Sequence, residues 1–541
     1  MTERDATTEQ DTVEELAPED IEPGTGETWD HLDRSAALTS AIYTFLPTAG
    51  AALITGYWLA VGMGLGPALA WTVPPLVLVV LIGAASGEWM RRVTKFRVDD
   101  ERLYVVTGVL VRKRLSLRRE RIRSVDITAD PVLRVFGATT VRVGTGEHAG
   151  AEGTVTLWPV RRAAADELRA TLLAHAAHAA SADGADQAET GTGTLVQFDR
   201  SWMRFAPLSF LTPTLGAAAA GGTIQVAEWF GMQERVLGVA GSWFSLGPVV
   251  LVAVILAVAL LIVGGLASTA FWIEAWWNHT LDREADGTLR VQRGLLTTRS
   301  ISLEESRLRG VELIEPLMAR LAGGARVDAV ATGLSTGEEN SSESQILLPV
   351  APRQLAGQVA ARVLREPSAP PTSTPLIGHP RAALGRRVRW ALATVASVEI
   401  VLVVLGLLLT PVLLHIAWIS ALVLVPIALL LARDAYRALG HAIAGPYLVM
   451  RSGSVRRATV ALQRRGIVGW TIRQSVFQRR AGLVTVETTT AAGTGGFSVH
   501  DAAQGAGLAV ADAAVPGLLR PFLLDADGKE PGGRAEASTN V

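Results

Sequence analysis

Three long apolar blocks constrain this chain most, because each is long enough to cross a lipid bilayer twice. They cover residues 38–90, 205–277 and 390–432, and one helical pass needs about 20 apolar residues. Each block is interrupted near its middle, by GMGLGP at 62–67, by GMQERVLGVAGSW at 231–243 and by TPVLLHIAW at 410–418. The pattern therefore predicts three transmembrane hairpins, with six membrane-spanning helices.

Basic residues lie on one side of these hairpins. The connections within the hairpins carry almost no charge, whereas Arg and Lys flank the blocks on the other side. These flanking residues are Arg91, Arg92, Lys95, Arg283, Arg381, Arg386, Arg387, Arg389, Arg433 and Arg437. Positively charged flanks stay in the cytoplasm, so we expect both termini and all three polar segments there.

The polar segments after the hairpins are copies of one another. With Gly108, Gly294 and Gly453 as origins, the same residue type recurs at fixed distances. Nine residues on are Leu117, Leu303 and Leu462; fourteen on, Ile122, Leu308 and Ile467; nineteen on, Ile127, Leu313 and Ile472; twenty-six on, Arg134, Arg320 and Arg479; twenty-nine on, Gly137, Gly323 and Gly482. Such ungapped matches indicate a unit of hairpin plus polar domain that occurs three times. The recurring glycines and arginines are expected to serve the fold.

Within a copy, the pattern is typical of β-strands. RLYVVTG, KRLSL, IRSVDIT and TTVRVGT alternate apolar and polar residues and end at Gly, Asp or Pro. The first two copies continue into amphipathic helices near 161–177 and 352–364. Each copy is thus predicted to form a β-sandwich or barrel with a C-terminal helix. The third copy is expected to be degraded, because its helix at 502–514 is rich in Ala and Gly.

These patterns give a provisional division of the chain. Residues 1–33 contain twelve acids and one Arg, which is typical of a disordered acidic tail. The expected segments are an acidic tail (1–34), hairpin 1 (35–90), domain 1 (91–180), a linker (181–200), hairpin 2 (201–277), domain 2 (278–366), a linker (367–387), hairpin 3 (388–433), a degraded domain 3 (434–516) and a disordered tail (517–541).

The strand motifs resemble a known family. Arg102-Leu103, Gly108, Arg121-Ile122 and Phe136-Gly137 fit the pattern of the bacterial pleckstrin-homology-like (PH-like) domain of YdbS/YdbT-type membrane proteins. The threefold plan over about residues 35–515 is similar to that of the larger YdbT-like members. The resemblance implies three PH-like domains on a multi-pass bacterial plasma-membrane protein, with a role in envelope stress or antimicrobial-peptide tolerance. It implies no reaction, because PH-like folds serve many binding roles.

No enzyme signature is found in the sequence. H-E-x-x-H, the P-loop pattern and G-x-S-x-G are missing, and the chain has no Cys. We therefore expect no enzyme, no cofactor and no metal. Glu399 lies midway along the fifth expected span, where a carboxylate is costly. It marks an alternative hypothesis, in which the hairpins form a transporter or channel-like component. The other interpretation is a neutral Glu hydrogen-bonded to a neighbouring helix.

A basic stretch begins directly after the second span. Residues 91–123 hold twelve Arg or Lys against four acids, close to a leaflet whose anionic lipids attract such residues. The candidates for binding are Arg112, Lys113, Arg114, Arg118 and Arg119. Three interpretations remain open: lipid-headgroup contact, a surface for another membrane protein or a sister copy, and a solvated flank without a ligand. Nucleic acid is not expected, because base-reading modules are lacking. The sequence favours a membrane-associated binding or scaffold protein.

Overall fold

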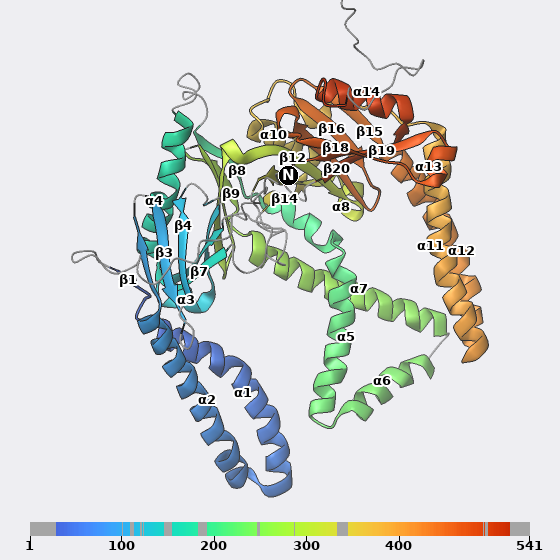
Figure 1. The fold of residues 1–541 in the computed structure, drawn as a ribbon. Coiled ribbons are helices and arrows are strands. Elements are labelled where there is room, and N and C mark those ends of the chain that lie inside the picture. Colours follow the sequence, from blue (N-terminus) through green and yellow to red (C-terminus); the bar gives the residue numbers. More distant parts are fainter. Residues whose placement is uncertain are drawn as a thin grey trace, which may run out of the picture. The chain divides into compact units, whose positions relative to one another are not determined.

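The structure is a computed structural model (Figure 1). It divides the chain into two compact units, where three domains were expected. It describes residues 29–99, 101–108, 113–119, 122, 124–144, 154–181, 192–245, 249–285, 287–332, 345–490, 492 and 496–519. The units are residues 1–306 and 307–541. Their boundary falls inside the expected second domain (278–366), so that segment is not a separate compact domain.

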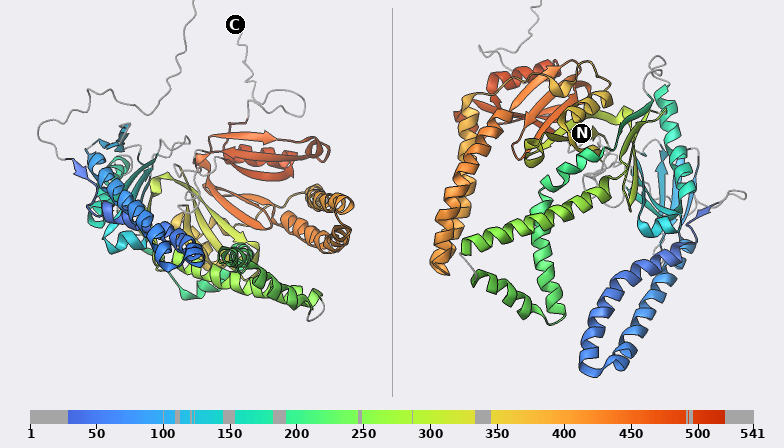
Figure 2. Two further views of the ribbon diagram at one scale, coloured as in Figure 1. Left: turned by 90° about the horizontal axis from the view of Figure 1, so that it is seen from below. Right: turned by 180° about the vertical axis from the view of Figure 1, so that it is seen from behind.

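Five helices in the described part of the chain are long and apolar enough to cross a membrane, judged by length and composition. They are α1 (Ala36–Met63), α2 (Leu65–Val93), α7 (Val249–Trp276), α11 (Arg381–Leu408) and α12 (Val412–Ala438). Helices α1 and α2 pair as one antiparallel hairpin, and α11 and α12 pair as another (Figure 2). The first and third apolar blocks therefore each form a pair of antiparallel helices.

The middle block differs from the expected hairpin. A 3-10 helix (Arg200–Leu208) leads into α5 (Leu211–Trp229), which is followed by a separate helix α6 (Gln233–Ser245) before α7. Helix α5 has 19 residues and is not among the five candidate spans. Its second half carries Gly221, Gly222, Thr223, Gln225 and Glu228. This polar content explains why six spans are not confirmed.

Glycines bring the hairpin helices close together. Gly83 and Gly87 of α2 face α1, where an added Cβ would clash with the Thr44 side chain and with the Ala36 carbonyl oxygen. In the middle block, Gly216 of α5 packs against the backbone of Leu260 in α7 in the same way. Without a hydrophobic driving force in lipid, such close backbone approach is how membrane helices gain packing energy.

The first unit contains two antiparallel sheets. The four-stranded sheet has the order β1-β2-β3-β4, and the seven-stranded sheet has the order β7-β6-β5-β11-β10-β9-β8. Their strands are β1 (Asp30–His31), β2 (Lys95–Val98), β3 (Arg102–Thr107), β4 (Lys113–Arg118), β5 (Ser124–Ala129), β6 (Ala138–Gly144), β7 (Thr154–Arg161), β8 (Gly193–Gln197), β9 (Thr280–Arg283), β10 (Thr288–Arg293) and β11 (Thr298–Glu304). Helices α3 (Pro131–Val135) and α4 (Arg162–Ser181) complete it.

The second unit repeats this plan with the later copies. Its sheets have the orders β14-β13-β12-β17-β16-β15 and β18-β19-β20. The strands are β12 (Leu308–Pro316), β13 (Gly324–Ala331), β14 (Ile346–Pro352), β15 (Gly440–Ala444), β16 (Tyr447–Ser452), β17 (Arg456–Gln463), β18 (Gly469–Arg473), β19 (Leu483–Thr489) and β20 (Gly496–Ala503). The helices outside the hairpin are α8 (Leu317–Leu321), α10 (Arg353–Val363), α13 (Val476–Arg480) and α14 (Gln504–Ala514).

Successive copies therefore share sheets. The second half of copy 1 (β5–β7) pairs with the first half of copy 2 through β5 and β11. The second half of copy 2 (β12–β14) pairs with the first half of copy 3 through β12 and β17. Each half of copy 2 thus belongs to a sheet that it shares with a neighbouring copy. This sharing explains why the boundary between the two units lies inside copy 2.

The first and third copies each enclose a hydrophobic core. In copy 1 the two sheets and α4 bury residues such as Leu103, Val141 and Leu172. In copy 3 the sheets and α14 bury Leu448, Val486 and Val510. The third copy was expected to be degraded, but its Ala- and Gly-rich helix α14 packs closely on β19 and β20. Small residues permit this approach, since a Cβ at Gly507 would meet the Val484 side chain at 2.8 Å.

The recurring glycines occupy backbone conformations that other residues rarely adopt. The origin glycines Gly108, Gly294 and Gly453 have φ of 114°, 111° and 91°, and the glycines twenty-nine residues on, Gly137, Gly323 and Gly482, have φ of 65°, 77° and 62°. A positive φ at these turns costs glycine little. Turn geometry therefore gives a physical reason for both glycine positions of the repeat.

Several expected tails and linkers contain ordered structure. Strand β1 and the buried Leu32 lie within the expected acidic tail 1–34, whose first 28 residues are outside the described part. Strand β8 lies within the expected linker 181–200, and α11 begins within the linker 367–387. Leu519, in the expected tail 517–541, belongs to the core of copy 3. Strands β1 and β8 pair with β2 and β9, and local composition does not report such pairing.

Candidate anion-binding groove at the first hairpin

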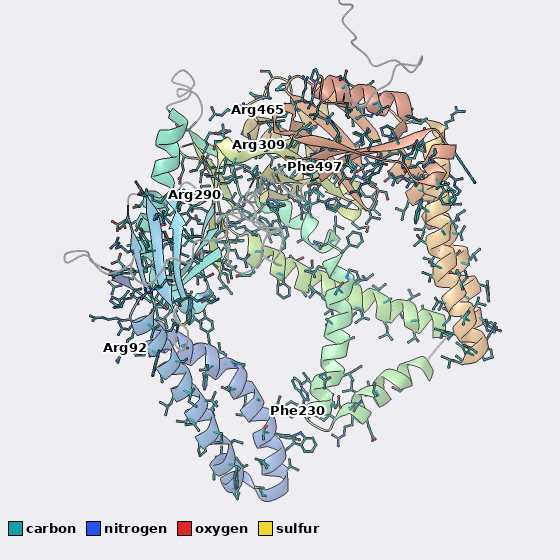
Figure 3. The ribbon with its side chains drawn as sticks, viewed as in Figure 1. Arg92, Phe230, Arg290, Arg309, Arg465 and Phe497 are labelled. Atoms are coloured by element: carbon teal, nitrogen blue, oxygen red, sulfur yellow. The ribbon has the colours of Figure 1, made fainter. Side chains whose placement is uncertain are left out.

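A groove lies where the first hairpin meets the first β-domain. Helix α1 begins here and α2 ends here, and the walls come from β1, β2 and the start of α4. The groove has a volume of about 950 Å³. Figure 3 shows Arg92 at this end of the hairpin. The lining residues are Asp30, His31, Leu32, Asp33, Arg34, Arg91, Arg92, Lys95, Phe96, Arg97, Val98, Val160, Arg161, Ala164, Glu167, Leu168 and Thr171.

Positive side chains predominate in this lining. Six of the lining residues are Arg or Lys and three are Asp or Glu. The six are Arg34, Arg91, Arg92, Lys95, Arg97 and Arg161. A hairpin that crosses a bilayer has its helix ends at the level of the lipid headgroups. The groove therefore combines a positive charge excess with a position at the end of a hairpin of two apolar helices.

A carboxylate one turn earlier holds the two arginines at the end of α2. Arg91 donates from Nε and Nη2 to the two oxygens of Glu88, at 2.8 and 2.7 Å, and Arg92 donates from Nε at 2.8 Å. Cations at a helix C-terminus also interact favourably with the helix dipole. The Arg92 side chain is 73% exposed, so it presents its remaining donors at the rim of the groove.

On the opposite wall of the groove, the Asp33 carboxylate is held by two hydrogen bonds. Its Oδ1 accepts a hydrogen bond from the Ser35 N–H at 2.9 Å, and its Oδ2 accepts one from Arg161 Nε at 2.7 Å. Burial alone would raise the pKa of Asp33, but the hydrogen bonds from Ser35 and Arg161 outweigh it and hold the pKa below its ordinary value. The ionised carboxylate thus ties the start of α1 to the end of β7.

Arg34 and Lys95 are the cations best placed for a ligand. Both side chains are exposed, and among the described residues neither makes an ion pair or a hydrogen bond. Arg97 differs, because it forms an ion pair with Asp99 and stacks on Trp29 and Tyr104, with its Cζ 5.6 and 5.2 Å from the ring centroids. Arg97 therefore shapes the groove, whereas Arg34 and Lys95 can bind an anion without giving up a protein contact.

The candidates named from the basic stretch lie elsewhere. Arg112 is outside the described residues, and Lys113, Arg114 and Arg118 lie on β4, away from the groove lining. Arg119 is buried and donates to the carbonyl oxygens of Thr171 and Asp99. These hydrogen bonds hold α4 against the β2–β3 turn, and Arg119 is outside the groove lining.

The sequence did contain a signal for the groove. As positive flanks of the hairpin, Arg91, Arg92 and Lys95 indicate orientation but do not by themselves mark a site. Arg34 lies in the expected acidic tail, and Arg161 lies about 70 residues beyond α2. Only the pairing of β1 with β2 (Asp30 opposite Phe96) brings these segments together.

Glu399 of α11 faces the neighbouring helix α12. Its Oε1 accepts a hydrogen bond from the Ser420 hydroxyl at 2.9 Å. In the described part of the chain no Arg, Lys or His forms an ion pair with it. This geometry matches a carboxyl group that joins two helices. Among the described residues, no group of three or more His, Asp or Glu side chains is arranged to hold a metal ion.

Comparison with known proteins identifies the fold of the first and third copies. The family model of the bacterial PH domain matches residues 45–176 and 391–520, nearly half of the chain. Each match includes much of a helix hairpin and the β-domain that follows it, and the second covers the copy that looked degraded. No curated protein and no solved structure matches the chain. The two matched regions are therefore bacterial PH domain regions, in a chain with five helices that are long and apolar enough to cross a membrane.

Proposed function

We propose that this protein binds anionic phospholipid headgroups in the groove at the end of the first hairpin. In this proposal the hairpins lie in a bacterial plasma membrane, and both termini and the β-domains are cytoplasmic. The protein acts there as a membrane-associated binding or scaffold protein in envelope stress or antimicrobial-peptide tolerance. The observation that carries the proposal is the surplus of cations in the groove, with Arg34 and Lys95 free of partners among the described residues.

The chemistry of the groove suits a phosphate diester. Guanidinium groups donate in a planar fork that matches phosphate oxygens, and Lys adds a compact charge. A basic residue near an anionic leaflet gains about 1 kcal/mol. The same groove is polar at its rim and apolar at Leu32, Phe96 and Val160, which suits a ligand with a charged head and a glycerol backbone.

The test uses the full chain in nanodiscs, because copy 1 shares its sheet with copy 2 and is not a separable domain. The nanodiscs contain phosphatidylglycerol and phosphatidylcholine, and native mass spectrometry reports which lipids stay bound after release. We expect the wild-type chain to retain phosphatidylglycerol. Arg34→Gln combined with Lys95→Gln should weaken this retention about tenfold, since each charge contributes up to about 1 kcal/mol.

A matched control removes the same charge from the same domain. Lys113→Gln combined with Arg118→Gln neutralises two exposed residues of β4 that lie outside the groove. This variant should retain phosphatidylglycerol as the wild type does. Equal loss in both variants would mean that only the overall charge of the domain matters, and the groove would then be rejected as the site.

A further inference from the structure

The two junctions between copies have the same register. In the first junction Ser302 of β11 faces Val125 of β5. Counted from the origin glycines, these are position 8 of copy 2 and position 17 of copy 1. In the second junction Ala461 of β17 faces Val311 of β12, again positions 8 and 17. A pairing that recurs with identical register is a property of the repeat, because a shift by one residue would turn every side chain to the other face.

Each junction buries apolar side chains from both copies. At position 19, Ile127 and Leu313 are 7% and 4% exposed. At position 7 of the following copy, Ile301 and Val460 are both 6% exposed. These residues lie on neighbouring strands, so each contributes about the burial energy expected of a core side chain. Position 19 faces position 6 and position 7 faces position 18, so the two apolar sets lie on opposite faces of the shared sheet. Each junction therefore has buried apolar side chains on both faces as well as a ladder of backbone hydrogen bonds.

Two strands of the repeat lack the neighbouring strand that forms the two junctions. Among the described strands, β4 of copy 1 pairs only with β3, and β18 of copy 3 pairs only with β19. Ile472, at position 19 of β18, is 42% exposed, although its counterparts are buried. Such open edges carry unused backbone donors and acceptors and readily accept a further strand.

A glycine in β18 indicates what kind of strand the edge accepts. Gly310 and Gly469 both occupy position 16 of their copies. At Gly310 an added Cβ would clash with the Ala461 carbonyl oxygen of the next copy. At Gly469 the nearest atoms are those of Thr489 at 3.8 Å. Copy 1 has Ser124 at this position, opposite Leu303, so glycine itself is not required there. In both junctions a small residue faces the position-9 leucine, and Gly469 gives β18 a small residue at the same position.

We propose that β18 of one chain pairs with β4 of a second copy of the same chain, in the register of the two internal junctions. Leu117 would then face Gly469, Ser116 would face Trp470, and Leu115 would face Thr471. The occupant is a second copy because the two open edges belong to the two halves of the junction that the repeat already makes twice. The contact is head to tail, so it generates a ring or a linear array.

Charge at the end of the proposed ladder is compatible with this pairing. Lys113 would face Arg473, and like charges directly opposite each other are unfavourable. Arg473, however, donates from Nε to Glu487 Oε2 at 3.0 Å on the neighbouring strand β19. The carboxylate offsets one of the two charges, and the remaining positions in the ladder are uncharged except Arg114.

Disulfide trapping tests the register directly, because the chain has no cysteine of its own. Leu115→Cys is placed in a chain with a long tag and Thr471→Cys in a chain with a short tag, and both are expressed together in one membrane. Directly opposite strand residues have Cα atoms about 4.5–5.5 Å apart, which is within the range for a disulfide. Mild oxidation should give a mixed dimer of the two tagged chains.

The register control shifts one cysteine by one residue. Ser116→Cys with Thr471→Cys places the two thiols on opposite faces of the proposed sheet, and its mixed dimer should be at least fivefold weaker. Equal yields for the two pairs would overturn the proposal. A second result would also overturn the proposal. In it, a single chain that carries both Leu115→Cys and Thr471→Cys forms an internal disulfide, while the two separately tagged chains give no mixed dimer.

A second variant keeps the test independent of cysteine chemistry. Ile472→Arg places a charge at an exposed position, so the fold of the single chain should be unchanged. Mass photometry in detergent should show the wild-type chain as assemblies of two or more copies and the variant mainly as single chains. Assemblies of unchanged mass in a correctly folded variant would contradict the proposal.

Discussion

The guanidinium of Arg320 lies 2.7 Å from the carboxylate of Asp434, measured from Nη2 to Oδ2. Arg320 lies in the last turn of α8 in copy 2. Asp434 lies in the last turns of α12, the helix that precedes copy 3. The equivalent arginine of copy 1, Arg134, also reaches forward, with Nη1 donating to the carbonyl oxygens of Leu295 and Leu296 at 2.6 and 3.1 Å. The recurring arginine therefore joins each copy to the next one.

Replacing Arg320 with Ala should destabilise the second unit by about 1.5 kcal/mol, the lower end of the range for hydrogen bonds to a charged group. Asp434 would keep its second partner, Arg457, at 2.7 Å, which limits the loss. Trp fluorescence during denaturation in detergent provides the measurement. The matched control is Arg479→Ala, at the same position of copy 3. Arg479 is exposed and makes no side-chain contact among the described residues, so a change below about 0.5 kcal/mol is expected there.

Gly87→Ala should weaken the first hairpin, because the new methyl group would clash with the Ala36 carbonyl oxygen of α1. Overpacking of this kind costs about 1–3 kcal/mol. Gly62→Ala in α1 is the control, since a Cβ there meets nothing within 4 Å. The thermal midpoint in detergent should fall for the first variant and stay level or rise for the second. A similar midpoint for both variants would show that the helices are not in close contact at Gly87.

The second unit should lose stability as pH falls below about 6.5. His441 is buried and lies with Nδ1 3.0 Å from Nε2 of His379. Burial, followed by repulsion from His379, lowers the pKa of His441 to about 4. The folded chain then binds fewer protons than the unfolded chain between pH 6.5 and 4, so acid favours unfolding, by up to about 3 kcal/mol.

His441→Gln should make the unfolding free energy of this unit less dependent on pH within that window. Gln can still hydrogen-bond to His379 but does not titrate. Unfolding midpoints at pH 7.0, 6.0 and 5.0 for both chains are the measurement. If both chains lose the same stability between pH 7.0 and 5.0, the histidine pair is not the cause.

Glu399→Gln should leave the protein folded and its lipid retention unchanged. The amide oxygen of Gln can accept the same hydrogen bond from Ser420, so the joint between α11 and α12 is preserved. Proton flux into vesicles that contain the full chain distinguishes the two hypotheses. No flux is expected from either protein. A flux that the wild type supports and Glu399→Gln abolishes would favour a proton-linked transporter instead.

The local features of the fold could be predicted from the sequence. The apolar blocks gave the first and third hairpins, and the alternating patterns located strands such as β3 and β6. The recurring glycines lie at turns where the backbone has a positive φ. Periodicity and turn geometry depend on a few neighbouring residues, and the sequence can therefore indicate them.

The pairing between copies could not be predicted in this way. The alternating pattern at residues 298–304 predicts a strand but does not identify its neighbours. Only the three-dimensional structure shows that β11 pairs with β5 of copy 1 as well as with β10 of copy 2. The same limit applies to the groove, which β1 and β2 assemble from residues far apart in the chain. Arg119 shows the same limit, because the sequence does not reveal that its guanidinium donates to the backbone carbonyl oxygens of Asp99 and Thr171.

The most direct test of headgroup binding maps where a lipid touches the full chain. The protein is reconstituted in vesicles that contain a trace of phosphatidylglycerol with a photoactivatable group on its headgroup, and labelled peptides are identified after irradiation. The account predicts labelling concentrated on residues 30–34 and 91–97, and reduced by Arg34→Gln with Lys95→Gln. Labelling of the basic flanks 381–389 and 433–437 at the same level as the groove, or equal labelling by a phosphatidylcholine probe, would contradict it.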